Sequence, residues 1–340
     1  MAANARQQDK DTVPLKIRLK AWWHGYDPAD VERLLRAHNR KKAEKAARKA
    51  AERRNTDDAV NSNDIELPFD PWDDRRAEVA QYIWGEGYCG PGGPEHIISI
   101  SKLLALSPEQ SLLDVGARLG GPARTLAEKF GVWVTGFEDS QRLADLANDK
   151  SHMAGMMKKV AVNHYDPETI DTFERKFDRA FSKEALFTVE NKKGLIEAVE
   201  QHLKPSGLFL MREFVLADDR AYSDPTFKEW REAEAGLARK PYMVTSHGLV
   251  EIIKNTGLNV RVQEDVTDEY IRLVNQGWIG ADKVAESLAE RDDADELLMT
   301  LLSEAEFWSR RVRLMEKGLL RVWRVLGSKR ADKPSMLSDW

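Results

Sequence analysis

The feature that most constrains the fold of this chain is an apolar run that ends in an acidic residue and enters a glycine-rich turn. Residues 112–121 read Leu-Leu-Asp-Val-Gly-Ala-Arg-Leu-Gly-Gly, and a helix-forming segment follows at residues 122–130. A strand, a tight turn and a helix in this order are typical of the nucleotide site of doubly wound α/β folds. Glycine is favoured there because the backbone turns sharply and approaches a ligand, which then faces the N–H groups of the helix N-terminus.

The next apolar segment fits the same interpretation. Residues 132–137 are rich in β-forming side chains, and Glu138 stands at their end. An acidic residue about twenty positions after the first glycine can accept hydrogen bonds from both hydroxyls of a ribose. Gly116 and Glu138 have this separation. An ordinary surface turn with a solvated glutamate is the alternative, but turn and acid together favour a nucleotide site.

Length and composition indicate a globular protein. The chain has 340 residues, of which 42% are hydrophobic and 32% charged, so it can hold one large or two modest domains. Its net charge of −5 provides no overall attraction to nucleic acid or membranes. The single cysteine, Cys89, excludes an internal disulfide and suits a reducing compartment. Residues 1–10 lack the apolar core of a signal peptide, and no run approaches the ~18 apolar residues of a membrane span, so we expect a cytoplasmic protein.

The chain divides into four zones. We predict an N-terminal extension with a basic helix and linker at 1–71, a nucleotide-binding core at 72–217, a helical substrate cover with the final strands at 218–330, and a tail at 331–340. Core strands are expected at residues 111–115, 133–137, 160–163, 177–181 and 208–214, and two later strands at 259–264 and 320–326. Strands that alternate with helices imply a doubly wound α/β fold with a mostly parallel sheet, preceded by the helical extension and interrupted by a helical insertion before the last strands.

The predicted basic helix has an unusual charge pattern. Residues 36–54 hold nine basic and two acidic side chains, and their apolar content is mostly alanine. Such a segment buries little area and projects into solvent. It could bind an anionic partner such as RNA, a lipid headgroup or an acidic protein, or it could be a solvated or oligomer-forming arm. No apolar stripe supports deep membrane insertion, so any membrane association would be peripheral.

Five further segments resemble one known family. The glycine-rich residues 85–93 resemble its Gly-Phe-x-Ser-x-Gly-Gly lead-in, and Leu-Lys-Pro-Ser-Gly at 203–207 resembles the turn before its fifth strand. Counterparts also exist for residues 177–189, 246–258 and 264–270. Together with Asp114 before the glycines, these motifs resemble the class I S-adenosylmethionine-dependent methyltransferases, nearest to the phosphoethanolamine and small-molecule N-methyltransferases. The resemblance covers residues 80–326 and implies a Rossmann-like methyltransferase fold.

The resemblance also implies a cofactor, S-adenosylmethionine, and the residues that bind it. Glu138 would hold the ribose, Asp166 would lie near the adenine amino group, and Ser182 would lie with Lys183 near the sulfonium. The glycine loop would line the methionine half of the cofactor through Asp114, Gly116, Arg118, Gly120 and Gly121. For Asp166, a helix cap before Pro167 is an alternative of equal weight.

Two positions depart from the family pattern. Arg118 stands where the family has its second glycine, so its side chain must point away from the cofactor or pair with the cofactor carboxylate. The alternative is that the guanidinium fills the pocket and abolishes binding. Thr188 stands near the place of a histidine that helps phosphoethanolamine methyltransferases to deprotonate the acceptor nitrogen. The specific acceptor is therefore left open.

The chemistry implied by the resemblance needs few groups. Methyl transfer is an in-line displacement from a sulfonium, so catalysis is chiefly alignment and desolvation. An amine acceptor must lose a proton, and a base such as His164, His247 or Glu184 would help. Tyr88 could close over the cofactor or hold a cation against its ring. The candidate catalytic residues are Tyr88, Lys183 and His247, with a packing or surface role as the alternative for each, and no cluster has the spacing of a metal site.

Two functions remain open at this point. The first is a methyltransferase that acts on a small polar or lipid-like acceptor, on nitrogen in preference to oxygen or carbon. The second is a catalytically silent methyltransferase fold that serves as a scaffold or regulator through its basic N-terminal helix, which Arg118 and the absent histidine would explain. A nicotinamide dehydrogenase is disfavoured because it expects Gly-x-Gly-x-x-Gly, which residues 116–121 do not supply.

Overall fold

The computed structural model describes residues 70–237 and 240–331, and these residues fall into two compact units. The larger unit comprises residues 70–279 and 299–331, and it contains the sheet. The smaller unit comprises residues 280–298, with α11 (Ala281–Ala289) and the first residues of α12 (Ala294–Glu316). The basic segment at 36–54 and its proposed anionic partner lie outside the described residues.

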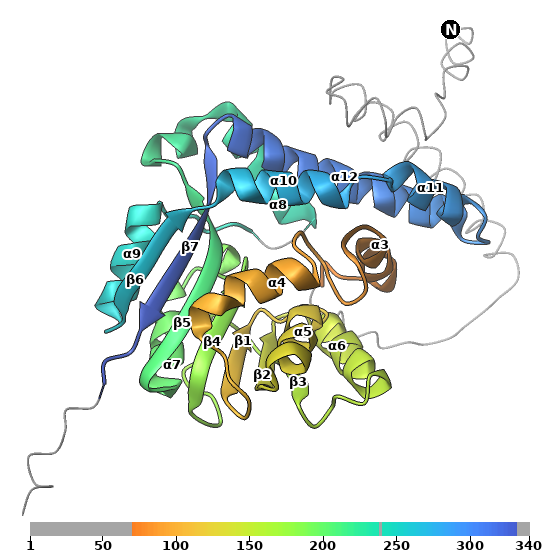
Figure 1. Ribbon diagram of the computed structural model, residues 1–340. Coiled ribbons are helices and arrows are strands. Elements are labelled where there is room, and N and C mark those ends of the chain that lie inside the picture. The colour runs from red at the N-terminus through yellow and green to blue at the C-terminus, as the bar shows by residue number, and fades with distance from the viewer. Residues whose placement is uncertain (1–69, 238–239, 332–340) are drawn as a thin grey trace, which may run out of the picture. The chain divides into compact units, whose positions relative to one another are not determined.

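A seven-stranded sheet forms the centre of the larger unit, with the strand order β3-β2-β1-β4-β5-β7-β6 (Figure 1). The strands are β1 (Ser111–Val115), β2 (Trp133–Glu138), β3 (Val160–His164), β4 (Phe177–Lys183), β5 (Leu203–Leu216), β6 (Asn259–Asp265) and β7 (Leu320–Ser328). The first five strands pair in parallel, and β7 pairs antiparallel with both β5 and β6. The predicted fold class is confirmed, and each predicted strand overlaps an observed one.

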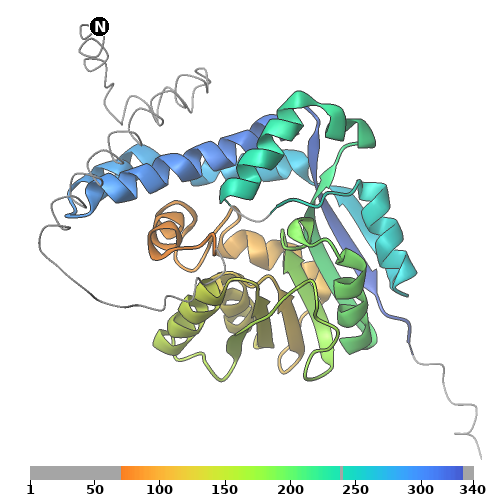
Figure 2. The ribbon, with the colours of Figure 1, turned by 180° about the vertical axis from the view of Figure 1, so that it is seen from behind.

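Helices cover both faces of this sheet. On one face lie α4 (Pro94–Ser101), α5 (Gly121–Phe130) and α6 (Gln141–Met153), and on the other lie α7 (Lys192–His202) and α9 (Ser246–Asn255) (Figures 1 and 2). The core under α7 and α9 is closely packed, and it includes Phe177, Leu195, Leu249 and Ile253, each at most 1% exposed.

Short polar side chains set the start of several of these helices. Ser140 Oγ accepts a hydrogen bond from the Leu143 N–H before α6 (3.1 Å), and Thr245 Oγ1 does the same for the Gly248 N–H before α9 (3.1 Å). Such caps satisfy N–H groups that have no partner within the helix. By contrast, α5 begins at Gly120 without a side-chain cap, so its N-terminal N–H groups face the glycine loop.

The remaining elements of the larger unit lie before and between the strands. They are α3 (Asp74–Trp84), η1 (Lys102–Leu104), η2 (Leu186–Thr188), η3 (Asp219–Ser223), α8 (Pro225–Leu237) and α10 (Thr267–Gly277). Trp84 of α3 contacts Trp308 of α12 and Trp278 after α10 edge-on, at centroid distances of 4.9 and 6.2 Å. The helical insertion before the last strands is thus confirmed. Within the described ranges, none of the helices has the length and apolar character needed to span a bilayer.

Replacement of Phe177 by alanine should lower the free energy of unfolding by about 3–5 kcal/mol, because it leaves a cavity among close-packed side chains. Urea denaturation followed by circular dichroism measures this loss. The matched control is Met153→Ala, since Met153 is 74% exposed and its change should stay within about 0.5 kcal/mol. Equal losses in the two variants would contradict the placement of the core.

Candidate active site

A pocket opens at the carboxyl ends of β1 and β4, where ligands bind in open α/β sheets. Its lining comes from four parts of the chain: the residues before and within α3, the lead-in loop at 87–90, the ends of β1 and β4 with the segments that follow them, and residues 304–311 of α12. Segments far apart in the sequence therefore build one site. All of these segments belong to the larger unit.

The glycine loop after β1 requires glycine at two points. Gly116 has φ +81°, and a Cβ there would lie 2.3 Å from the Cβ of Ala185. Gly121 donates its N–H to the Gly87 carbonyl (3.0 Å), and a Cβ on Gly121 would lie 2.3 Å from that oxygen. The glycine loop therefore packs directly against the lead-in loop. From the sequence, the two loops were connected only through the resemblance to one family.

Glu138 holds this loop in place. Its side chain is fully buried, and Oε2 accepts a hydrogen bond from the Arg118 N–H at 2.7 Å while Oε1 accepts one from the Ser140 N–H at 3.3 Å. Arg118 adopts the left-handed conformation (φ +52°), which directs its N–H at the carboxylate. Glu138 and the glycine loop therefore lie together, as their spacing in the sequence led us to expect.

The Arg118 side chain lies inside the pocket. Its Nη1 is 3.7 Å from Glu138 Oε1, and its Nη2 donates to the Glu184 carbonyl at 3.4 Å. The guanidinium thus extends from the end of β2 to the end of β4 and covers the buried Glu138. Of the alternatives left open by the sequence, the first is wrong: the side chain does not point away from the pocket but belongs to its lining.

Two predicted polar residues, at the ends of β1 and β4, each have one buried oxygen without a hydrogen-bond partner among the described residues. Asp114 is 2% exposed with its Oδ2 unpaired, and Ser182 is fully buried with its Oγ unpaired. Burial raises the pKa of Asp114 to about 7, against the opposing effect of nearby Lys183. Lys183 Nζ donates to Glu184 Oε2 at 3.0 Å, and burial lowers its pKa.

Glu184 anchors a buried polar network behind the pocket. Its Oε1 accepts hydrogen bonds from Arg212 Nε (2.8 Å) and lies 2.7 Å from Nη2, and Arg212 Nη1 contacts His96 Nε2. Burial opposes ionisation of Glu184, but Arg212 and Lys183 outweigh it and hold its pKa at about 2. Burial, followed by Arg212, lowers the pKa of His96 to about 4. Glu184 is therefore a fixed anion and a poor proton acceptor.

Aromatic side chains form much of the remaining wall. Tyr88 is 4% exposed, and its hydroxyl shares a hydrogen bond with Thr125 Oγ1 at 2.6 Å, so it stands at the pocket as predicted. Thr188 also lines the pocket, and its hydroxyl donates to the Ala185 carbonyl at 3.4 Å. The other rings in the lining are Trp72, Phe181, Phe187, Phe307 and Trp308.

Two predicted residues are exposed away from the pocket, and four others do not belong to its lining although they lie in the same segments as residues that do: Gly120, Gly121, Glu138 and Ser182. His247 is exposed on α9, because the helix buries its opposite face through Leu249 and Ile253. Asp166 is exposed, and its carboxylate accepts hydrogen bonds from the Glu168 N–H (3.0 Å) and the Thr169 hydroxyl (2.9 Å). Asp166 therefore stabilises a local turn; no helix begins at Pro167, so it is not the helix cap that was the alternative.

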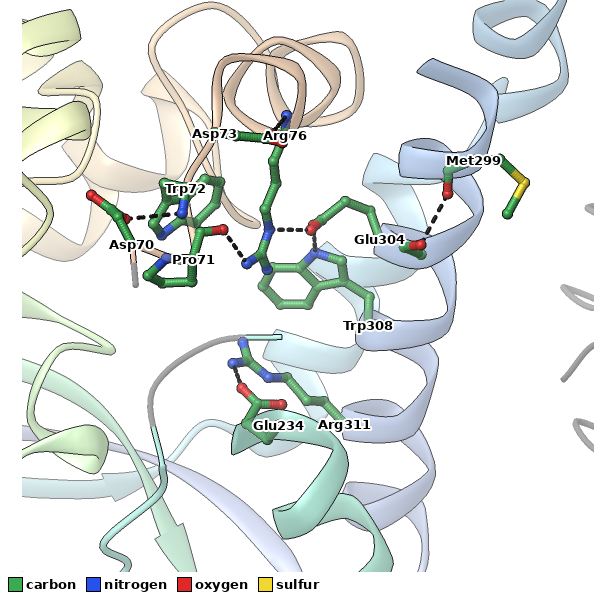
Figure 3. Close-up of polar contacts among 11 residues, drawn as sticks. Asp70, Pro71, Trp72, Asp73, Arg76, Glu234, Met299, Glu304, Trp308 and Arg311 are labelled. Carbon is green, nitrogen blue, oxygen red and sulfur yellow. Dashed lines mark hydrogen bonds and ion pairs between the residues drawn. The ribbon is translucent and has the colours of Figure 1, made fainter. Parts of the chain in front are cut away.

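Sequence reasoning missed the charged residues of the outer wall. Glu304, Phe307, Trp308 and Arg311 stand at positions i, i+3, i+4 and i+7 of α12, so they share one face of the helix and line the pocket together. Arg76 Nε donates to Glu304 Oε1 at 2.6 Å, and Arg311 Nη2 pairs with Glu234 of α8 (Figure 3). The helical spacing was readable in the sequence, whereas the partners were not.

Comparison with known proteins gives one family and several relatives. Residues 95–263 match the methyltransferase domain family. The phosphoethanolamine N-methyltransferase of Plasmodium falciparum is 25% identical over 77% of this chain and 94% of its own length. Phosphoethanolamine N-methyltransferase 1 of Zea mays is 26% identical over 57% of this chain but only 37% of its own length. The sterol 24-C-methyltransferase erg6 of Schizosaccharomyces pombe is 29% identical over 57% of this chain and 54% of its own length.

Solved structures share the fold. Phosphoethanolamine N-methyltransferase 2 of Haemonchus contortus, in complex with phosphomonomethylethanolamine and S-adenosylhomocysteine, superposes with a TM-score of 0.65 at 21% identity, over 75% of this chain and 57% of that one. The cyclopropane synthase MmaA2 of Mycobacterium tuberculosis gives a TM-score of 0.63 at 16% identity, over 78% of this chain and 100% of that one. Through residues 95–263, this chain belongs to the methyltransferase domain family, as the sequence resemblance predicted.

Proposed function

We propose that this chain transfers the methyl group of S-adenosylmethionine to the nitrogen of a small acceptor bound against the aromatic wall of the pocket. The observation that carries the proposal is the position of the glycine loop and its two acids, Asp114 and Glu138, beside that wall. Family membership and relatives named as N-methyltransferases support the same reaction. The described residues provide no group of three or more His, Cys, Asp or Glu that could hold a metal ion.

The site has features that suit the cofactor. The unpaired Oδ2 of Asp114 can accept a hydrogen bond from the ammonium of the methionine portion. Gly116 keeps the adjacent backbone open, and Glu138 offers a carboxylate for the ribose hydroxyls once Arg118 moves. Bound there, the cofactor supplies an electrophilic methyl group on a sulfonium.

The residues of this chain then align the acceptor and exclude water. The nitrogen lone pair forms the new bond to the methyl carbon, and the electron pair of the broken C–S bond stays on sulfur. The acceptor enters as the neutral amine, and the methylated ammonium product releases its proton to solvent. Lys183, at the end of β4, is proposed to position the acceptor, because its Nζ is held by Glu184 Oε2 at 3.0 Å and lines the pocket. The Tyr88 ring also lines the pocket.

Calorimetry with S-adenosylhomocysteine tests cofactor binding. We expect the wild-type protein to bind, whereas Gly116→Ala should bind at least roughly 100-fold more weakly because its Cβ meets Ala185. Gly155→Ala is the matched control, since Gly155 also has positive φ (+66°) but open space around it.

Mass spectrometry of an amine panel then detects methylated product. Absence of cofactor binding at millimolar concentration would end the proposal.

Arg118→Gly should strengthen cofactor binding by about tenfold or more. The change removes the guanidinium from the ribose position and relieves the left-handed strain, while the main-chain N–H to Glu138 remains. Arg142→Ala, at an exposed arginine of α6, is the control. The alternative function, a catalytically silent scaffold, was also motivated by Arg118. It would be supported if the Arg118→Gly variant bound the cofactor and the wild-type protein did not. Weaker binding by Arg118→Gly would mean that the guanidinium itself holds the cofactor.

Cofactor affinity should fall as the pH drops through about 7. Above that pH the Asp114 carboxylate is ionised and attracts the cofactor ammonium; below it the group is protonated, and affinity declines by up to roughly tenfold per pH unit. Calorimetry between about pH 5.5 and about pH 7.5 measures the slope. Asp114→Asn should bind weakly and lose the part of the slope centred near pH 7, while Glu138, whose pKa burial raises to about 8, still titrates in that variant. A steep slope retained in that variant would assign the titration to another group.

The proposed homo-oligomer and the proposed peripheral membrane association stay predictions, as do the zone boundaries at 71, 217 and 330. The same holds for the binding of RNA, lipid headgroups or an acidic protein by residues 36–54, which lie outside the described ranges. Small-molecule acceptors are supported by the relatives, which are named as enzymes of phosphoethanolamine and sterol methylation.

A further inference from the structure

We infer that the acceptor of this pocket is an amine without a phosphate group, carried on an apolar or aromatic body. The inference rests on the proposed function and narrows its substrate class. It follows from the charges of the pocket wall and their partners. In this respect the chain would differ from its relatives that are named for phosphoethanolamine.

Each cation that lines the pocket, over the described part of the chain, already has a carboxylate partner. Arg118 lies 3.7 Å from Glu138, and Lys183 lies 3.0 Å from Glu184. Arg76 lies 2.6 Å from Glu304, and Arg311 pairs with Glu234 (Figure 3). Arg118 is set aside, because the proposed function has it leave Glu138 when the cofactor binds; the other three cations offer paired positive charge only.

The pair at the outer wall is the most deeply buried. The side chains of Arg311 and Glu234 are 7% and 1% exposed. Four rings surround the guanidinium, with centroids 4.0 to 5.4 Å from its carbon: Phe187, Phe214, Phe307 and Trp308. Arg311 Nε is buried and has no hydrogen-bond partner among the described residues. The charge of the guanidinium is nevertheless paired with Glu234 through Nη2.

Arg76 is held in a similar way. Its guanidinium stacks on Trp72 at 4.4 Å and on Phe307 at 5.1 Å, and its Nη1 donates to the Pro71 carbonyl at 3.0 Å. Its partner Glu304 also accepts a hydrogen bond from Trp308 Nε1 at 3.3 Å. Removal of Arg76 from this arrangement would leave a buried carboxylate without its counter-ion, which is costly.

A phosphate dianion is poorly matched to this wall. Four acids line the pocket beside the four cations, namely Asp114, Asp139, Glu184 and Glu304. A phosphate would lose its hydration and gain a counter-charge only by breaking a buried ion pair. An amine instead meets the faces of the aromatic rings in the lining, which favour a cationic or neutral nitrogen.

The experiment compares two matched pairs of ligands with the S-adenosylhomocysteine-loaded protein: ethanolamine with phosphoethanolamine, and tyramine with tyramine O-phosphate. Calorimetry should show that each phosphorylated member binds at least roughly tenfold more weakly than its partner. Equal or tighter binding of the phosphorylated members would overturn the inference, as would binding of neither member of either pair. Failure of the protein to bind S-adenosylhomocysteine would instead count against the proposed function.

A second variant reverses the expected preference. Glu234→Gln removes the partner of Arg311, so phosphoethanolamine should gain at least roughly tenfold in affinity while S-adenosylhomocysteine binding stays unchanged. Glu229→Gln, at an exposed position of the same helix, is the matched control and should change neither. Should Glu234→Gln lose its fold, Glu304→Gln releases Arg76 for the same comparison. Phosphate affinity that stays unchanged in a folded variant would contradict the charge argument.

Discussion

The pocket depends on one carboxylate that lies beneath it. Glu138 is buried at the end of β2 and accepts the main-chain N–H of Arg118, which fixes the turn after β1 in a left-handed conformation. That turn sets the direction of α5 and the contact between Gly121 and Gly87. The glycine loop, the lead-in loop and the uncapped start of α5 therefore share a single anchor, and the proposed function gives the same carboxylate a second role in holding the ribose.

The electrostatics of the site follow from burial. Charged groups removed from water need partners, and the wall supplies them as ion pairs between distant segments. Asp114 departs from this rule, because its Oδ2 lacks a hydrogen-bond partner among the described residues and its pKa rises to about 7. A buried polar atom without a partner in an otherwise satisfied site is where a ligand donor is most useful. The arrangement thus directs a cationic group towards β1 and an apolar surface towards α12.

The sheet could be predicted from the sequence because its signals are local. Apolar runs mark the end of β1 at Val115 and place the end of β4 at Phe181, two residues before its observed end at Lys183. Glu138 is marked by its spacing from Gly116. The ion pair of Arg311 and Glu234 joins residues 77 positions apart, and no pattern along the chain links them. Asp166 was ambiguous because a cap and a ligand-binding acid have the same local sequence. His247 was misplaced because a histidine near a helix start does not reveal which face of the helix it occupies.

One short segment of α12 supplies several kinds of side chain to the pocket wall. Its acid, its rings and its cation all stand on residues 304–311 of α12, so they share one rigid backbone and shift together with it. The sheet, the glycine loop and Glu138 contribute nothing to that stretch. Exchange of one helical segment could therefore alter which molecules are accepted while the machinery for the methyl donor is left intact, and this separation offers a simple route by which relatives of one ancestral enzyme diverge.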